Sequence, residues 1–260
     1  MMIPPAPTPP LPVLQILSET ARLHWTHILV FLAAAALFAI PMTLALMPVA
    51  DDLLRMTGTP TPEAFEHLVG PMMRVALLGL ALGAVLFAFW ARLTLMGPRA
   101  ALAADPGGWP LRSLKVAGLL LLAWITASLA MMPISAVLGL MGGAALSQYL
   151  IAMLSILAMA FFYALFSRWM VESALDIRRA SSAPRPAVPL AAHVRLAALL
   201  TAVILGLIVI QTVVHGLLVA VGAELTARVA GGIFMTLIVT TYASIHAIVY
   251  RLRTVPPGNG

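Results

Sequence analysis

The chain has 260 residues, of which 62% are hydrophobic and 9% are charged, and so few polar residues exclude an ordinary soluble domain. It contains no cysteine, which also excludes disulfides, thiolate metal sites and thiol nucleophiles. The net charge of +6 comes from fourteen arginines and one lysine. In a membrane protein this excess indicates orientation and contact with anionic lipid rather than binding of nucleic acid.

The first residues, 1–12, form a proline-rich segment with proline at positions 4, 5, 7, 9, 10 and 12. Proline cannot sustain a helix interior, so we expect an extended, disordered tail. Its P-x-x-P spacing leaves docking of a partner open, although disorder is the simpler interpretation of this composition.

Residues 13–27 have the periodicity of an amphipathic helix. Apolar positions recur on one face and polar positions on the other: Leu14, Leu17, Ala21 and Trp25, against Gln15, Glu19, Arg22 and Thr26. We expect this helix to lie on the membrane surface, with the indole of Trp25 at headgroup depth. Glu19 is expected to pair with Arg22 one turn away.

Long stretches without charge predict six transmembrane helices, because about 20 apolar residues cross the hydrocarbon core of a bilayer. The expected spans are about 25–49, 73–96, 114–138, 145–168, 196–221 and 229–250. The uncharged stretch 116–167 is too long for one crossing and is expected to turn back at Gly139, Gly142 and Gly143. The fold class is therefore an all-α polytopic bundle, with a single membrane domain over 13–252 and a short tail over 253–260.

The expected spans contain no Asp or Glu, which excludes carboxylate-based proton relays and intramembrane aspartyl chemistry. The connection 51–72 holds four carboxylates, and its Thr61-Pro62-Glu63 predicts a short helix over 62–69. The spacing of these carboxylates matches no metal site, so we interpret them as solvated. The last two spans are expected to be joined by a short turn at 222–228.

Lysine and arginine are retained on the cytoplasmic side of bacterial inner-membrane proteins. If the amino end is cytoplasmic, twelve of the fifteen basic residues fall on that side: Arg22, Arg92, Arg99, Arg112, Lys115, Arg168, Arg178, Arg179, Arg185, Arg195, Arg251 and Arg253. Only Arg55, Arg74 and Arg228 fall on the other side. The sequence thus predicts a multi-pass protein of a bacterial inner membrane with both termini in the cytoplasm.

The second span contains the G-x-x-x-G motif Gly79 to Gly83, which allows another helix to approach closely. Packing within the bundle is the favoured interpretation, because a bundle must bury its small faces. Self-association through Gly79 and Gly83 into a homo-oligomer remains the alternative.

Polar residues inside the membrane concentrate in the last two spans, where Gln211, His215, Thr236 and Thr240 form a candidate polar path. Gln211 and His215 share a helix face, and interhelical hydrogen bonding is the simpler interpretation of all four. Arginine binds phosphate oxygens through paired hydrogen bonds, so the inner basic residues are candidate contacts for anionic headgroups. These candidates are Arg92, Arg99, Arg112, Lys115, Arg168, Arg178, Arg179 and Arg195.

No catalytic, cofactor or metal motif is present: there is no G-x-S-x-G and no H-E-x-x-H, and the six histidines are scattered along the chain. The expected catalytic, cofactor-binding and metal-binding residues are therefore none.

Two stretches carry a resemblance to a known group. The opening Ile16-Leu17-Ser18-Glu19-Thr20-Ala21-Arg22-Leu23-His24-Trp25 resembles the start of uncharacterised bacterial six-helix inner-membrane proteins. Residues 91–102, Ala-Arg-Leu-Thr-Leu-Met-Gly-Pro-Arg-Ala-Ala-Leu, followed by Leu111-Arg112-Ser113-Leu114, are similar to their middle connection. That group includes the membrane domain found fused to glycerophosphodiester phosphodiesterases. The resemblance implies a six-helix membrane domain and no phosphodiesterase activity, because no hydrolase domain is attached.

Three functions follow as hypotheses, in order of preference. The first is a non-enzymatic bundle that acts through lipid or protein contacts, as an envelope or assembly factor. The second is a small carrier or channel whose path runs beside the candidate polar residues. The third is a lipid-modifying enzyme, ranked last because no nucleophile or general base accompanies the arginines.

Overall fold

The computed structural model describes residues 12–55, 62–102, 108–140, 144–176 and 188–254, and every regular element within them is a helix. The helices are α1 (Val13–Thr26), α2 (Ile28–Arg55), α3 (Pro62–Leu102), α4 (Gly108–Leu140), α5 (Ala144–Leu175), α6 (Leu190–Ala220) and α7 (Glu224–Thr254). Six of them are long and apolar enough to cross a membrane. The predicted all-α polytopic fold is thereby confirmed.

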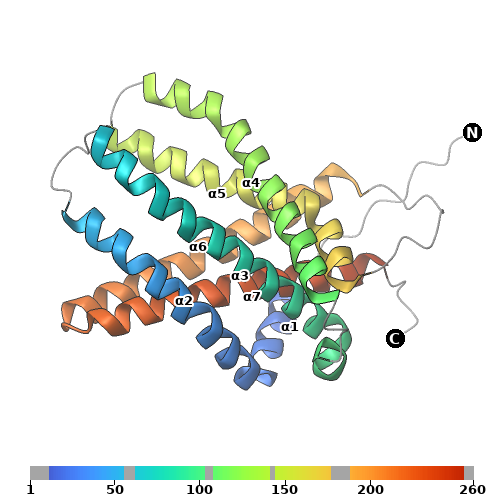
Figure 1. Ribbon diagram of the computed structural model, residues 1–260. Helices are drawn as coiled ribbons and strands as arrows, with labels where there is room; N and C mark the ends of the chain where they lie inside the picture. Colours follow the sequence, from blue (N-terminus) through green and yellow to red (C-terminus); the bar gives the residue numbers. More distant parts are fainter. Residues whose placement is uncertain (1–11, 56–61, 103–107, 141–143, 177–187, 255–260) are drawn as a thin grey trace, which may run out of the picture.

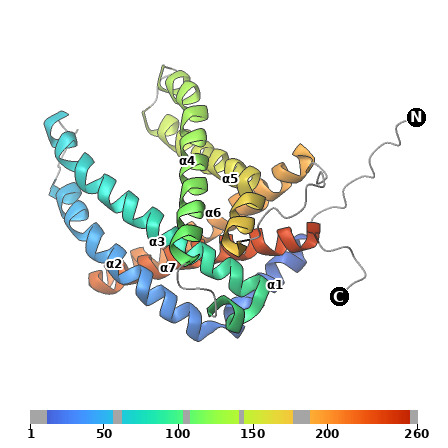
Figure 2. The same ribbon diagram turned by 45° about the vertical axis from the view of Figure 1, so that its right-hand side comes forward.

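Helices α2 to α7 form three consecutive hairpins, α2–α3, α4–α5 and α6–α7. The hairpins converge near α1 and spread apart toward the opposite end of the molecule (Figures 1 and 2). Consecutive helices run in opposite directions along the bundle. The end of the bundle at which α1 lies therefore also contains the last turns of α3, α5 and α7 and the first turns of α4 and α6. We call this end of the bundle the basic end.

Helix α7 is the centre of the bundle and packs against α1, α2, α3, α5 and α6. In its apolar segment 61% of the residues are buried, against 17–28% in the other five spans. The remaining helices therefore leave most of their apolar surface outward, as expected of helices whose surroundings are lipid. Helix α4 packs on α3 and α5 and lies farther from the centre (Figure 2).

Small residues on α7 allow this close packing. A Cβ atom added to Gly232 would lie 2.6 Å from Cβ of Ala39 and 2.9 Å from its Cα, so α2 and α7 nearly touch at backbone level.

The helices extend beyond the predicted spans. Helix α4 begins at Gly108 instead of 114, α5 continues to Leu175 instead of 168, and α6 begins at Leu190 instead of 196. The absence of charged residues locates the segment of each helix that crosses the hydrocarbon core. The helical hydrogen bonding continues beyond that segment into the headgroup region, where charged side chains are tolerated.

Three smaller expectations are corrected. The predicted short helix 62–69 is the beginning of α3 and not a separate element. The turn predicted at 222–228 occupies Val221–Ala223, where Gly222 has a φ of +73° that suits glycine, and α7 starts at Glu224. The tail predicted from 253 begins later, because α7 ends at Thr254. The proline-rich segment 1–11, residues 255–260 and the turn glycines 142 and 143 lie outside the described residues.

Helix α3 contains one break that the sequence analysis did not anticipate. Gly97 has φ 80° and ψ 171°, which are not helical values, and Pro98 follows it. Glycine tolerates this conformation because it lacks a Cβ atom. The break turns the final residues, through Leu102, away from the axis of α3.

Candidate functional site

Helix α1 lies against the basic end of α7. Its buried side chains are Ile16, which is fully buried, and Thr20. Its most exposed large apolar residues are Leu14 at 83% and Trp25 at 80%, which project away from the bundle. Helix α1 thus has one face on the protein and an apolar face outside it, the arrangement expected of an interfacial helix.

The predicted pair of Glu19 with Arg22 is replaced by a contact between helices. The carboxylate of Glu19 accepts a hydrogen bond from Arg251 at the end of α7, and Gln15 donates a second one at 2.9 Å. A residue 232 positions away in the chain cannot be found from helical spacing, which explains the wrong prediction.

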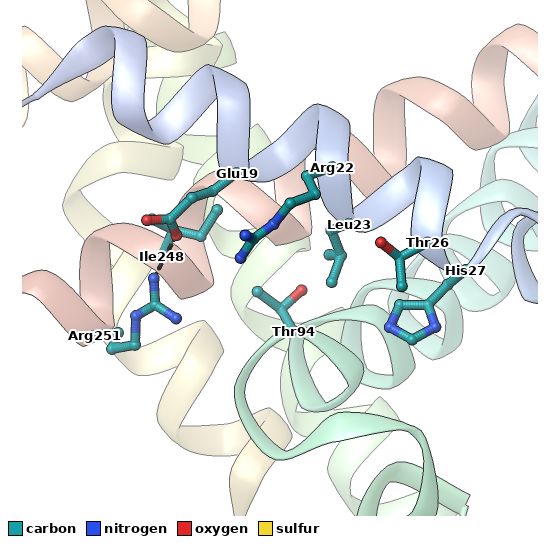
Figure 3. Close-up of a pocket in the computed structure, with 8 residues that line it drawn as sticks. All are labelled: Glu19, Arg22, Leu23, Thr26, His27, Thr94, Ile248 and Arg251. Atoms are coloured by element: carbon teal, nitrogen blue, oxygen red, sulfur yellow. Dashed lines mark hydrogen bonds and ion pairs between the residues drawn. The ribbon is translucent and has the colours of Figure 1, made fainter. Parts of the chain in front are cut away.

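A pocket with a volume of about 390 Å³ lies between α1, α3 and α7 (Figure 3). Its lining residues are Glu19, Arg22, Leu23, Thr26, His27, Thr94, Ile248 and Arg251. We call it the α1 pocket. Arg22 and Arg251 point toward the same hollow, with the carboxylate of Glu19 beside Arg251 (Figure 3). Two guanidinium groups against one carboxylate leave a net positive charge, so the pocket suits an anion with an apolar portion.

His24 of α1, which is not among the lining residues of this pocket, joins α1 to α7. Its Nδ1 donates a hydrogen bond to the carbonyl oxygen of Thr20 at 2.8 Å, and its Nε2 lies 2.8 Å from Oγ1 of Thr240. Burial lowers the pKa of His24 below its ordinary value, and the bond to the Thr20 carbonyl opposes this only in part. The neutral ring is thus favoured, and in that form Thr240 donates its hydroxyl proton to Nε2.

Two further buried hydrogen bonds connect α7 to its neighbours. Trp90 Nε1 donates to Oγ of Ser244 at 2.9 Å, and Ser167 Oγ lies 2.5 Å from Nδ1 of His246. The second pair has the residue types of a nucleophile and its base. However, Ser167 is 4% exposed and His246 is fully buried, and neither lines the α1 pocket. A substrate in the α1 pocket would not reach Ser167 or His246. Their contact is therefore interpreted as a hydrogen bond that holds α5 against α7.

Another group of polar side chains lies where the last turns of α3 and α5 meet the first turns of α4. Arg92 is 5% exposed and Arg112 is 9% exposed, although both are charged. Arg92 donates to the carbonyl oxygens of Ala174 at 3.4 Å and Ala100 at 3.2 Å, and its guanidinium carbon lies 5.7 Å from the ring centre of Trp109. The group is therefore held by backbone and aromatic contacts.

Arg112 and Lys115 share one carboxylate in this cluster. Arg112 Nη2 lies 3.4 Å from Asp176, and Lys115 Nζ lies 3.9 Å from the other oxygen of the same side chain. Gly108 packs under Arg112, since an added Cβ would lie 2.9 Å from Nη2.

The other candidate lipid contacts differ in their surroundings. Arg168 pairs with Glu172 at 2.9 Å, while Arg99 and Arg195 are exposed. Arg178 and Arg179 lie outside the described residues. Some of the predicted lipid contacts are thus bonded to other protein groups, whereas others are exposed.

The four residues of the candidate polar path lie in different environments. Thr236 and Thr240 are fully buried on α7. The hydroxyl of Thr236 donates to the carbonyl oxygen of Gly232, whereas the hydroxyl of Thr240 lies within hydrogen-bond distance of both the carbonyl oxygen of Thr236 and Nε2 of His24. Gln211 is half-buried, with its amide nitrogen near Gly231, and His215 is exposed. None of the four lines the α1 pocket. The carrier hypothesis stays a prediction from the sequence.

The glycine motif of α3 faces α2. A Cβ on Gly79 would lie 3.4 Å from the terminal carbon of Met42, and Gly83 is buried. This geometry fits packing within the bundle, whereas self-association through Gly79 and Gly83 stays untested.

A multi-pass helical membrane protein with a positively charged pocket under an interfacial helix is the class that these features define. Over the described part of the chain, His, Asp and Glu side chains form no group of three that could hold a metal ion. Comparison with protein-family models, with curated proteins and with solved structures gave no match.

Proposed function

We propose that the protein is a non-enzymatic bundle of a bacterial inner membrane that binds anionic phospholipid in the α1 pocket, as an envelope or assembly factor would. The observation that carries the proposal is the pairing of Arg22 and Arg251 across one hollow, between a helix with an exposed apolar face and the end of the central helix α7. A phospholipid offers both a phosphate for the guanidinium groups and acyl chains that continue into the bilayer.

The proposed orientation places the α1 pocket at the cytoplasmic headgroup layer. It is supported by the charge distribution, since twelve of the fifteen basic residues belong to the basic end or its connections. The chain has no cysteine, so single-cysteine variants can be labelled without background. Cysteine at position 195 should react with a membrane-impermeant maleimide only after cells are opened, and cysteine at position 223 should react in intact cells. The reverse pattern would overturn the orientation.

Lipid binding is tested with the purified full chain in nanodiscs. Arg22→Gln should weaken binding of phosphatidylglycerol at least fivefold relative to the wild type, because Arg22 lines the pocket and is exposed, so its loss leaves the helix packing intact. Arg74→Gln is the control, because Arg74 is an exposed arginine outside the pocket and outside the set of candidate lipid contacts. Equal affinities for all three proteins would refute the α1 pocket as the lipid site.

A further inference from the structure

The polar cluster at the ends of α3, α4 and α5 carries more positive charge than its described partners balance. Arg92, Arg112 and Lys115 contribute three positive charges, whereas Asp176 contributes the one carboxylate within ion-pair distance of this group in the described residues. The guanidinium groups of Arg92 and Arg112 are close enough to repel each other. Buried like charges are rare in proteins unless an opposite charge compensates them.

Several donors of these two arginines have no acceptor. Among the described residues, Nε of Arg92 and both Nε and Nη1 of Arg112 are buried without a hydrogen-bond partner. A guanidinium group has five N–H donors, and Arg112 uses Nη2 alone, toward Asp176 at a long distance of 3.4 Å. Buried polar groups are normally hydrogen-bonded, so three unpaired nitrogens in one cluster indicate an absent acceptor.

We propose that the Arg92–Arg112 cluster is a binding site for a phosphate group, and that the carboxylate of Asp176 occupies the place of that phosphate when it is absent. A phosphate monoester carries close to two negative charges and several acceptor oxygens, which matches the excess charge and the unpaired donors of the cluster. A single carboxylate matches neither.

Asp176 has the properties of a displaceable group. It follows directly after the end of α5, where its φ of +55° lies in the left-handed region that aspartate tolerates better than most residues with a side chain, so no helical hydrogen bonding beyond it holds its backbone. Its side chain is 37% exposed and that of Lys115 is 48% exposed, so the cluster opens on this side while Arg92 and Arg112 stay buried. A phosphate can enter here as the carboxylate moves out.

This site is separate from the α1 pocket, with which it shares no residue. It does not require the proposed function to be correct. The phosphate can come from a lipid with a monoester headgroup, because the cluster lies at the ends of membrane-spanning helices, or from free phosphate in solution.

The experiment measures the melting temperature of the full chain in phosphatidylcholine nanodiscs, titrated either with inorganic phosphate or with phosphatidic acid incorporated in the disc. Asp176→Asn removes the competing carboxylate and should tighten phosphate-group binding about fivefold or more, even if the variant itself melts lower. Arg112→Lys keeps one charge but lacks the paired donors, and should weaken binding. Arg74→Gln, which removes an exposed arginine from the other half of α3, should bind as the wild type does.

The two arms identify the source. A response to inorganic phosphate supports a soluble ligand, and a response to phosphatidic acid alone supports a lipid. If neither arm stabilises the wild type or Asp176→Asn, the proposal is overturned. If Asp176→Asn binds no more tightly than the wild type, Asp176 does not occupy the phosphate position. Because Arg22→Gln leaves this cluster untouched, failure of the α1 pocket is distinguished from failure here.

Discussion

The close approach of α2 and α7 gives the sharpest test of the packing. Gly232→Ala places a methyl group 2.6 Å from Cβ of Ala39, where neither backbone can yield without moving a helix. Alanine improves helix propensity by about 0.5–1 kcal/mol, whereas one carbon too many in a packed interior costs about 1–3 kcal/mol. Gly206→Ala in α6 is the matched control, because nothing lies within 4 Å of its added Cβ.

The two variants carry the same substitution in helices of similar length, so their difference isolates the steric term. We expect Gly232→Ala to be less stable than Gly206→Ala by about 1–3 kcal/mol, a melting temperature roughly 2–12 °C lower. The assay is thermal unfolding of the purified protein in nanodiscs, followed by tryptophan fluorescence. Ala39→Gly combined with Gly232→Ala should recover part of the loss. Equal melting temperatures for Gly232→Ala and Gly206→Ala would refute the contact.

Two other outcomes follow from the buried polar contacts of α7. The docking of α1 through His24 should be fully present above a pH of about 6.5 and weaken as pH falls below it, since burial lowers the pKa of His24 and the undocked form takes up the proton first. Amide hydrogen exchange of residues 13–26 between pH 8 and pH 5 measures this, and in His24→Gln the pH dependence should vanish. A double-mutant cycle of Trp90→Phe with Ser244→Ala should give a coupling of about 0.6 kcal/mol in the free energy of unfolding, the usual value for a hydrogen bond between membrane helices. A coupling of zero would show that this bond does not form.

The spans were predictable because crossing a bilayer is a property of local composition. A window of apolar residues is sufficient to identify each helix, and the division of residues 116–167 between two helices followed from their excess length. The glycines chosen for the turn located it only approximately, because Gly139 lies within α4, which ends at Leu140. Helix ends were predicted less well, because charge marks the headgroup boundary rather than the last hydrogen-bonded turn. The break at Gly97 was missed because a glycine and a proline near a span end fit both a helix terminus and a break within a helix.

The candidate site depended on contacts between distant parts of the chain. Composition drew attention to Arg112 as a lipid contact, but its burial is decided by α5, which supplies Asp176, and by Gly108 beneath it. In the same way His24 was visible only as one of six scattered histidines, because its partner Thr240 lies 216 residues further along. Amphipathic periodicity was sufficient to locate α1. Which of its residues face α7 could not be predicted, because this depends on how the other helices pack.

Two of the side chains that tie the helices together also belong to the two proposed binding sites. Arg251 ties α7 to Glu19 of α1 and lines the α1 pocket, and Asp176 ties α5 to Arg112 of α4 within the phosphate cluster. Between apolar helices in lipid the hydrophobic effect gives little preference for association, so polar contacts between helices add to van der Waals packing in holding them together. The hairpins meet at the basic end and spread at the other (Figure 2). If the proposed sites bind anions, a ligand in the α1 pocket would compete with Glu19 for Arg251, and a phosphate in the cluster would displace Asp176 from Arg112. We therefore expect ligand binding at the basic end to loosen the contact of α1 with α7 and that of α4 with the end of α5.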